Sequence, residues 1–180
     1  MVDMLPEQGH FLLHNFFLGS LKNESRTTKK KQILDAVPVD KANYQPDACA
    51  KTANELLRHI AVADNMFLVT VINGVFNPSA VAIPENVKTS LEVAAWYEQT
   101  YSRNFEALTK LTGEQLVKIV DFRGLIQQPA VLFLQFGLVH TVHHRGQLST
   151  YLRPMGSKVP AIYGESYDSA LAKKAAQAQA

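Results

Sequence analysis

The stretch Leu138–Gly156, read as LVHTVHHRGQLSTYLRPMG, carries three of the six histidines of the chain within five residues. At about 100° per residue, a helix through this stretch places His140, His144, Gln147 and Tyr151 on one face. The same face continues the apolar residues that come before it, so it is the side expected to point into a protein core. His140 and His144 are therefore expected to be neighbours on the buried side of a long helix.

The four-residue spacing of His140 and His144 is typical of metal-binding helices. Side chains four residues apart lie on consecutive turns, with Cβ atoms about 5–6 Å from each other, and two imidazoles at this interval can reach one ion. His143 lies about 60° to the side of His140, which predicts a flanking or surface position. Because such pairs also arise by chance, a metal site requires a third ligand.

A third inward-facing histidine comes from the segment NELLRHIAVADNMF, residues 54–67. Its helical spacing places His59 on a face with Leu56, Ala63 and Met66. A single inward histidine is commonly a hydrogen-bonded core residue, and that interpretation remains the alternative for each of the three. Three such residues on two helices favour a shared divalent metal, because burying several imidazoles without partners is costly.

Other polar residues are weaker candidates for the same site. His10 and His14 share the four-residue spacing but lie near the start of their segment, so they rank second. Ligand histidines usually donate their second ring N–H to a carboxylate or carbonyl, and Glu55 and Asp64 are the nearby carboxylates in sequence. Gln147 lies on the ligand face, where it can hydrogen-bond a bound water or ligand. Gln147 and Glu55 are therefore the catalytic candidates.

Three further residues have structural interpretations. Arg145 points away from the histidine face, which predicts pairing with a neighbouring helix or a partner chain. Gly146 costs about 1 kcal/mol relative to alanine inside a helix, which indicates a close helix approach there. The single cysteine, Cys49, cannot form an internal disulfide. It is interpreted as a buried, inert thiol, although thiols near a helix start can have a lowered pKa.

The chain as a whole predicts an all-α fold, a four-helix bundle in a single domain over residues 1–180. Long apolar-periodic segments alternate with short breaks, and no alternating strand pattern is present. Helices are expected over about residues 6–36, 48–72, 84–115 and 128–153. Long loops follow at residues 74–86 and 155–169, before an alanine-rich tail of weak helical character.

The composition excludes several classes of function. With 47% hydrophobic residues, 19% charged residues and a net charge of +2, an extended nucleic-acid surface is not expected. The basic run Lys29–Lys31 is interpreted as a solvated helix face. No apolar run reaches the ~20 residues of a membrane span, and the N-terminal residues do not read as a signal peptide. These features, with a single cysteine, predict a cytoplasmic protein.

Two stretches together carry a family resemblance. ELLRHIAVAD, followed much later by HTVHHRGQLSTYLRPMGSKVPAIYGES, resembles the DinB-like superfamily of metal-binding four-helix bundles. That superfamily includes the bacillithiol S-transferases and the mycothiol-dependent maleylpyruvate isomerases. The likeness covers most of the chain and includes the H-x-x-x-H-R-G-Q signature and the VPAIYG segment. It implies a metal triad at His59, His140 and His144, with zinc or nickel as the ion and a low-molecular-weight thiol as a possible cosubstrate.

Two classes of function follow. Three imidazoles leave coordination positions open for water or a thiol, which is typical of a catalytic site, and imidazole alone suits zinc, nickel, iron or copper. The first hypothesis is a metal-dependent thiol S-transferase or hydrolase acting on a small electrophilic molecule. The alternative is a non-catalytic metal-binding or stress-associated bundle. Apolar runs at residues 11–21 and 131–139 further predict a homodimer, because they leave one apolar face uncovered.

Overall fold

The structure is a computed structural model that describes residues 26–179, with side chains from Lys31 onward. His10, His14 and the apolar run at residues 11–21 lie outside the described residues, as do the side chains of Lys29 and Lys30. Lys31 forms ion pairs with Asp35 at 2.6 Å and Glu98 at 3.9 Å.

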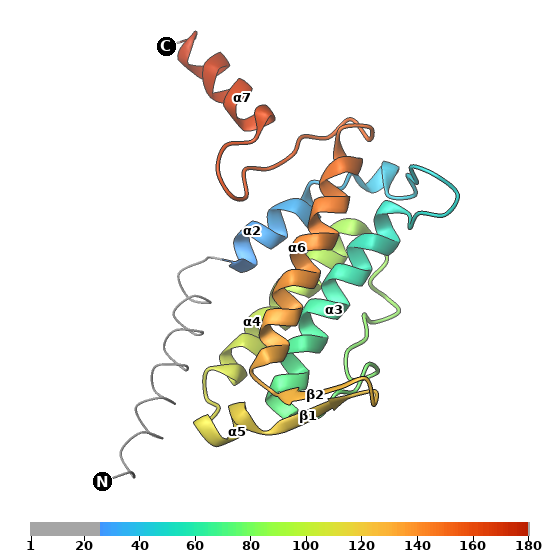
Figure 1. Cartoon of the computed structure of the whole chain (residues 1–180). Helices are drawn as coiled ribbons and strands as arrows, with labels where there is room; N and C mark the ends of the chain where they lie inside the picture. The colour runs from blue at the N-terminus through green and yellow to red at the C-terminus, as the bar shows by residue number, and fades with distance from the viewer. Residues whose placement is uncertain (1–25, 180) are drawn as a thin grey trace.

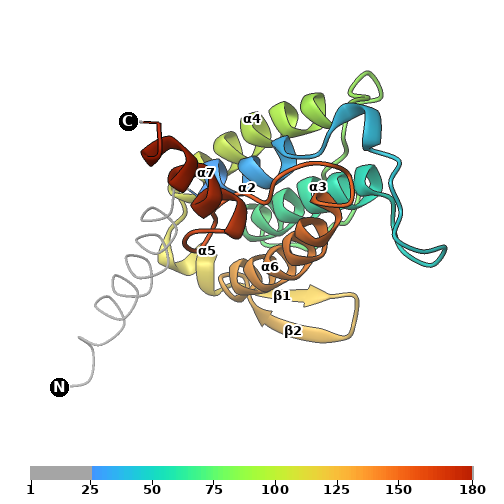
Figure 2. The same cartoon turned by 90° about the horizontal axis from the view of Figure 1, so that it is seen from above.

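Four helices build the body of the molecule and run side by side (Figure 1). They are α2 (Arg26–Asp35), α3 (Ala53–Asn73), α4 (Ser90–Leu108) and α6 (Leu132–Leu152). Seen from above, α2 and α3 lie between α4 and α6 (Figure 2). The core between the helices is made of large, fully buried side chains, among them Ile33, Leu34, Leu56, Leu57, Ile60, Tyr97, Phe133, Leu148 and Leu152. The fold is therefore mostly helical, as the sequence predicts.

Helix α3 has well-defined signals at both ends. The Thr52 hydroxyl accepts a hydrogen bond from the Glu55 amide, and the Glu55 carboxylate accepts one from the Thr52 amide, which is a capping box. Gly74 ends the helix with a left-handed φ of 62°. The predicted start near residue 48 is wrong, because the Asp47 carboxylate accepts hydrogen bonds from the amides of residues 49 and 50 and holds them in a turn.

Helix α4 is also shorter than its apolar pattern predicts. A capping box of Thr89 and Glu92 sets its start, so residues 84–89 lie outside the helix. The helix ends at Leu108, and a separate short helix, α5 (Gly113–Val117), follows with a third capping box. Cap residues therefore decide the helix bounds in places where the apolar pattern runs on.

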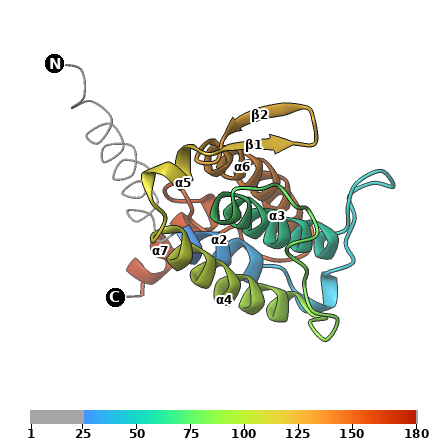
Figure 3. The ribbon, with the colours of Figure 1, turned by 90° about the horizontal axis from the view of Figure 1, so that it is seen from below.

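A small antiparallel hairpin corrects the all-α prediction. Strand β1 (Ile119–Phe122) pairs with β2 (Ile126–Pro129) across a turn in which Arg123 and Gly124 both have positive φ. Each strand has only four residues, too few for a clear alternating pattern. The predicted helix start at residues 128–129 is wrong because Pro129 belongs to β2. Viewed from below, the hairpin covers the outer side of α6 (Figure 3).

The alanine-rich tail forms helix α7 (Tyr167–Gln177), as its composition suggests. Asp168 ties it to the end of α6, since its carboxylate accepts hydrogen bonds from the Val159 amide at 2.8 Å and from Arg153 Nε at 3.2 Å. Within the described residues, no helix is long and apolar enough to cross a membrane.

A close approach of α3 and α6 lies at Gly137, whereas the close helix approach predicted at Gly146 is absent from the described helices. A Cβ atom on Gly137 would lie 2.9 Å from the Phe67 Cβ atom, whereas one on Gly146 would meet nothing within 4 Å. Gly146 faces solvent, so no helix within residues 26–179 packs against it. The absence of a side chain at Gly137 lets the two helices that carry the inward histidines pack together.

A matched pair of substitutions tests this assignment. Gly137→Ala is expected to lower the free energy of unfolding by about 1–3 kcal/mol, because the added methyl group overpacks against Phe67. Gly146→Ala is expected to raise it by about 0.5–1 kcal/mol, since alanine favours the helix and space is available. Urea unfolding of both variants measures the difference. Equal effects of the same sign would contradict the assignment.

Candidate metal centre

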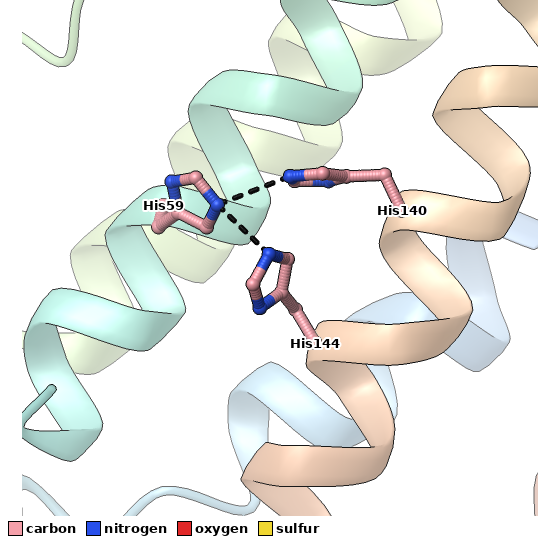
Figure 4. Close-up of side chains that lie close together, drawn as sticks. All are labelled: His59, His140 and His144. Atoms are coloured by element: carbon pink, nitrogen blue, oxygen red, sulfur yellow. Dashed lines mark hydrogen bonds between the residues drawn. The ribbon is translucent and has the colours of Figure 1, made fainter. Parts of the chain in front are cut away.

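Three histidine side chains from α3 and α6 converge (Figure 4). His59 Nε2 lies 3.1 Å from His140 Nε2 and 3.0 Å from His144 Nε2. One ring nitrogen from each residue lies within 4.8 Å of the other two. The structure thus brings together the three histidines that the helical periodicity selected.

Helix geometry explains the convergence. His140 and His144 lie one turn apart on α6, so their rings stand one above the other, with centroids 4.4 Å apart. His59 reaches them from the facing side of α3, and its ring centroid lies 4.9 Å and 4.5 Å from theirs. All three side chains are half-buried, so the cluster is accessible from solvent and still partly shielded from it.

The cluster has the dimensions of a metal site. With metal–nitrogen bonds of about 2.0–2.1 Å, two imidazole nitrogens are about 3.3 Å apart in a tetrahedral site and about 2.9 Å apart in an octahedral one. The two distances from His59 Nε2 lie between these values. The donor set of three imidazoles fits a borderline divalent ion such as zinc or nickel.

Hydrogen bonding favours the protonation state that ligation requires. His144 Nδ1 lies 2.7 Å from Gln147 Oε1, an acceptor that holds the ring proton on Nδ1. That tautomer leaves the Nε2 lone pair directed at the cluster. Gln147 thus lies against the cluster as predicted, and its contact is with a histidine ring.

Burial favours the neutral imidazoles of His59 and His140. Desolvation, followed by the charge of His144, lowers the pKa of His59. Desolvation, with smaller effects from His144 and His59, lowers the pKa of His140 to about 4, although the Asp64 carboxylate opposes the shift. Neutral imidazole is the form that binds metals.

These shifts predict a pH effect on the metal-free protein. Between pH 6.5 and about 4 the unfolded chain protonates His140 while the folded chain does not. The stability contributed by the neutral ring is therefore complete above pH 6.5 and is lost as pH falls through this window. Urea unfolding in the presence of a chelator measures the slope of stability against pH. His140→Asn is expected to flatten the slope, and an unchanged slope would contradict the prediction.

A buried carboxylate lies behind the cluster. Asp64 accepts hydrogen bonds from the Tyr97 hydroxyl at 2.7 Å and from Thr141 Oγ1 at 2.9 Å, and so links α3 to both α4 and α6. Burial, reinforced by the Asp64 charge, raises the pKa of Tyr97 well above its usual value, so the phenol stays a donor. The sequence suggested Asp64 as a carboxylate near the ligands but gave no signal for Tyr97 or Thr141.

His140 differs from His144 in its second ring nitrogen. His140 Nδ1 is buried, and none of the described residues makes a hydrogen bond to it. Thr141, the next residue, already donates its hydroxyl to Asp64. The ring is instead fixed by packing, with its centroid 5.7 Å from that of Phe67.

The remaining candidates lie around the cluster. Glu55 is exposed and its carboxylate binds the amide and hydroxyl of Thr52 at the start of α3. Arg145 is buried, donates to the Tyr163 hydroxyl, and stacks at 4.6 Å over that ring. Its partner is therefore the loop after α6, which includes the VPAIYG segment. His143 is exposed, as predicted, with its ring centroid 4.8 Å from that of His144.

Cys49 corrects another prediction. The thiol is exposed, whereas the sequence interpretation made it buried. The Cys49 amide is held by the Asp47 carboxylate in the turn before α3. The error has the same origin as the wrong helix start, because a residue in a surface turn has no buried helix face.

Comparison with known proteins agrees with the fold and gives the family of the chain. The sequence model of the DinB family matches residues 15–176. The chain belongs to the DinB family.

Two relatives in Bacillus subtilis (strain 168) are similar in sequence. The uncharacterized protein YjoA is 29% identical over 150 residues, which cover 82% of this chain and 87% of YjoA. The uncharacterized protein YrdA is 38% identical over 80 residues, 43% of this chain and 47% of YrdA.

Two crystal structures share the fold. The DinB-like protein YjoA from Bacillus subtilis superposes with a TM-score of 0.66 at 23% identity, covering 85% of this chain and 99% of the other. A DinB-like protein from Bacillus cereus ATCC 10987 gives a TM-score of 0.65 at 25% identity, covering 82% and 95%.

Proposed function

We propose that the protein is a metal-dependent transferase of the thiol S-transferase type, or a hydrolase, that acts on a small electrophilic molecule. His59, His140 and His144 hold one divalent ion, zinc or nickel, within a four-helix bundle formed by a single domain over residues 1–180. The observation that carries the proposal is the convergence of three Nε2 atoms, those of His140 and His144 lying 3.1 Å and 3.0 Å from that of His59. A bound ion of this kind lowers the pKa of water or of a thiol toward neutrality.

The side chains around the cluster have separate roles in this proposal. Gln147 orients the His144 ring through its Nδ1 contact, and Glu55 fixes the start of the helix that carries His59. These two residues remain the catalytic candidates, and Gln147 is favoured because it lies against the cluster. In the transferase reaction, the thiol sulfur bonds to an electrophilic carbon, the leaving group departs with its bonding electrons, and the thiol proton is released.

A non-catalytic metal-binding or stress-associated bundle is the second candidate function. It is favoured by the buried Asp64, which links α3, α4 and α6 beside the cluster through hydrogen bonds. This arrangement suits a metal ion that stabilises the bundle. Exchange of water bound to the metal distinguishes the catalytic from the non-catalytic function. Exchangeable water is expected of the catalytic site, which needs an open coordination position. We also propose a cytoplasmic homodimer that uses a low-molecular-weight thiol; light scattering at micromolar concentration tests the dimer.

Activity is expected to depend on the histidines and not on the cysteine. His140→Ala is expected to lower metal-dependent turnover by at least about 100-fold because it removes a metal ligand, whereas Cys49→Ser, a change on the surface, leaves it unchanged. The assay offers an aryl halide with a panel of low-molecular-weight thiols, and an aryl ester for hydrolysis, to tag-free protein loaded with zinc or nickel. Loss of activity in the cysteine variant at full metal occupancy, with activity retained in the histidine variant, would favour a cysteine nucleophile.

A further inference from the structure

An apolar cavity of about 870 Å³ lies next to the histidine cluster, between the hairpin, α3 and α6. Its apolar lining is formed by Phe67, Phe122, Ile126, Leu132, Phe136 and Val139. Sites for small molecules have volumes of about 300–1,000 Å³ and are lined mainly by such side chains. The cavity therefore has the size and the lining of a small-molecule site.

The polar lining of the cavity carries no permanent charge. Apart from the apolar residues, Gln128, Gln135, His140 and His143 line it, and among the described residues no lysine, arginine, aspartate or glutamate takes part. In the metal-free protein, a charged group that entered would lose hydration without gaining an ionic partner from these side chains. The two glutamine amides offer both donors and acceptors for a neutral polar group such as a carbonyl.

His140 joins the cavity to the cluster. The His140 side chain lines the cavity, and its Nε2 atom lies 3.1 Å from that of His59. On the cavity side, the Phe67 ring packs against the His140 ring, with centroids 5.7 Å apart. A molecule held in the cavity would thus lie directly beside the three histidines.

We infer that this cavity binds an uncharged, largely apolar molecule, aryl or branched alkyl in character, and that this class supplies the electrophilic substrate. The role of this molecule as a substrate rests on the proposed function, whereas its binding depends only on the cavity. Exposed apolar side chains in its lining agree with an apolar occupant, since Val139 is 61% exposed and Phe136 is 39% exposed. The amides of Gln128 and Gln135 then favour neutral molecules that carry a polar group able to hydrogen-bond with them.

A pair of fluorescent probes tests the charge preference on the full-length, tag-free protein treated with a chelator, so that no divalent ion at the histidine cluster attracts the anionic probe. N-phenylnaphthylamine is neutral, and anilinonaphthalene sulfonate is the same ring system with an added sulfonate. The neutral probe is expected to bind once per chain and at least about tenfold more tightly, because the cavity offers the sulfonate no cationic partner. The net charge of +2 favours the anion instead, so equal or tighter binding of the sulfonate would overturn the inference.

Two identical substitutions on α6 locate the bound probe. Val139→Asp places a carboxylate in the cavity and is expected to weaken binding of N-phenylnaphthylamine by at least about tenfold. Val142→Asp is the matched control, because Val142 is also exposed but lines a different cavity with Arg145 and Tyr163. Circular dichroism verifies that both variants fold. Equal losses, or no loss in the Val139 variant, would place the probe elsewhere and overturn the inference.

Two further measurements separate the cavity from the metal and from self-association. Zinc titration of Val139→Asp is expected to give the same stoichiometry as that of the wild-type protein. If the wild-type protein binds the neutral probe but no zinc, the metal function is refuted and the binding cavity is supported. Light scattering on the same variant is expected to give the wild-type mass. A change from dimer to monomer, without saturable probe binding to wild-type protein, would identify a second copy as the occupant and overturn the inference.

Discussion

Replacing His144 with alanine is expected to abolish stoichiometric binding of a divalent metal, with a loss of affinity of more than about 100-fold. His144 supplies one of the three converging Nε2 atoms, at 3.0 Å from that of His59. His143→Ala is the matched control on the next residue, because His143 is exposed and no ring nitrogen of it belongs to the cluster. Calorimetric titration of tag-free protein with zinc measures both variants.

The two variants are informative because they differ only in which helix face loses an imidazole. Full stoichiometry in His143→Ala with none in His144→Ala is the expected result. Equal loss in both would show that the metal is held by surface histidines, and equal retention would show that the cluster is a set of core histidines.

Replacing Asp64 with alanine is expected to lower the free energy of unfolding by about 2–4 kcal/mol. The change removes the acceptor of two buried hydroxyl donors, those of Tyr97 and Thr141, and each buried donor left unpaired costs about 1–2 kcal/mol, in the lower part of the usual range because a hydroxyl can rotate toward another acceptor. Because Asp64 links α3, α4 and α6, metal affinity is expected to fall as well. Denaturant unfolding and zinc titration measure the two effects.

The control for Asp64 is Asp40→Ala, which removes an exposed carboxylate of the same type. A surface change of this kind alters stability by no more than about 0.5 kcal/mol. A loss in Asp64→Ala as small as that of the control would contradict the structural role assigned to the buried carboxylate.

The histidine cluster was accessible to sequence reasoning because helical periodicity is a local property. The spacing of His140 and His144, and the inward face that includes His59, follow from about 100° of rotation per residue. The facing of α3 against α6, by contrast, depends on tertiary packing at Gly137 and Phe67. The sequence therefore predicts the pair His140 and His144 and the inward His59 separately, and the fold brings them into contact.

Other features were missed for physical reasons that can be named. The hairpin of residues 119–129 consists of two four-residue strands, too short for period-two alternation to stand out. The donors to Asp64 come from residues 97 and 141, which lie far from it in sequence. The apolar cavity is formed by the hairpin, α3 and α6 together, so it was not predicted once the strands had been missed.

The capping boxes lay in the sequence but were overlooked. Thr52 with Glu55 and Thr89 with Glu92 both fit the pattern of a threonine followed three residues later by glutamate. Both predicted helix starts are too early, because the apolar pattern begins before each of these start signals. The Glu55 carboxylate, a candidate for the site, binds Thr52 at the start of α3.

The X-ray absorption spectrum at the zinc edge of wild-type, tag-free protein loaded with one equivalent of zinc tests whether the three histidines form a metal centre. Three imidazole nitrogens at about 2.0–2.1 Å, together with at least one oxygen from water, are expected. A spectrum with oxygen scatterers alone, or with a single imidazole, would contradict a metal centre formed by His59, His140 and His144.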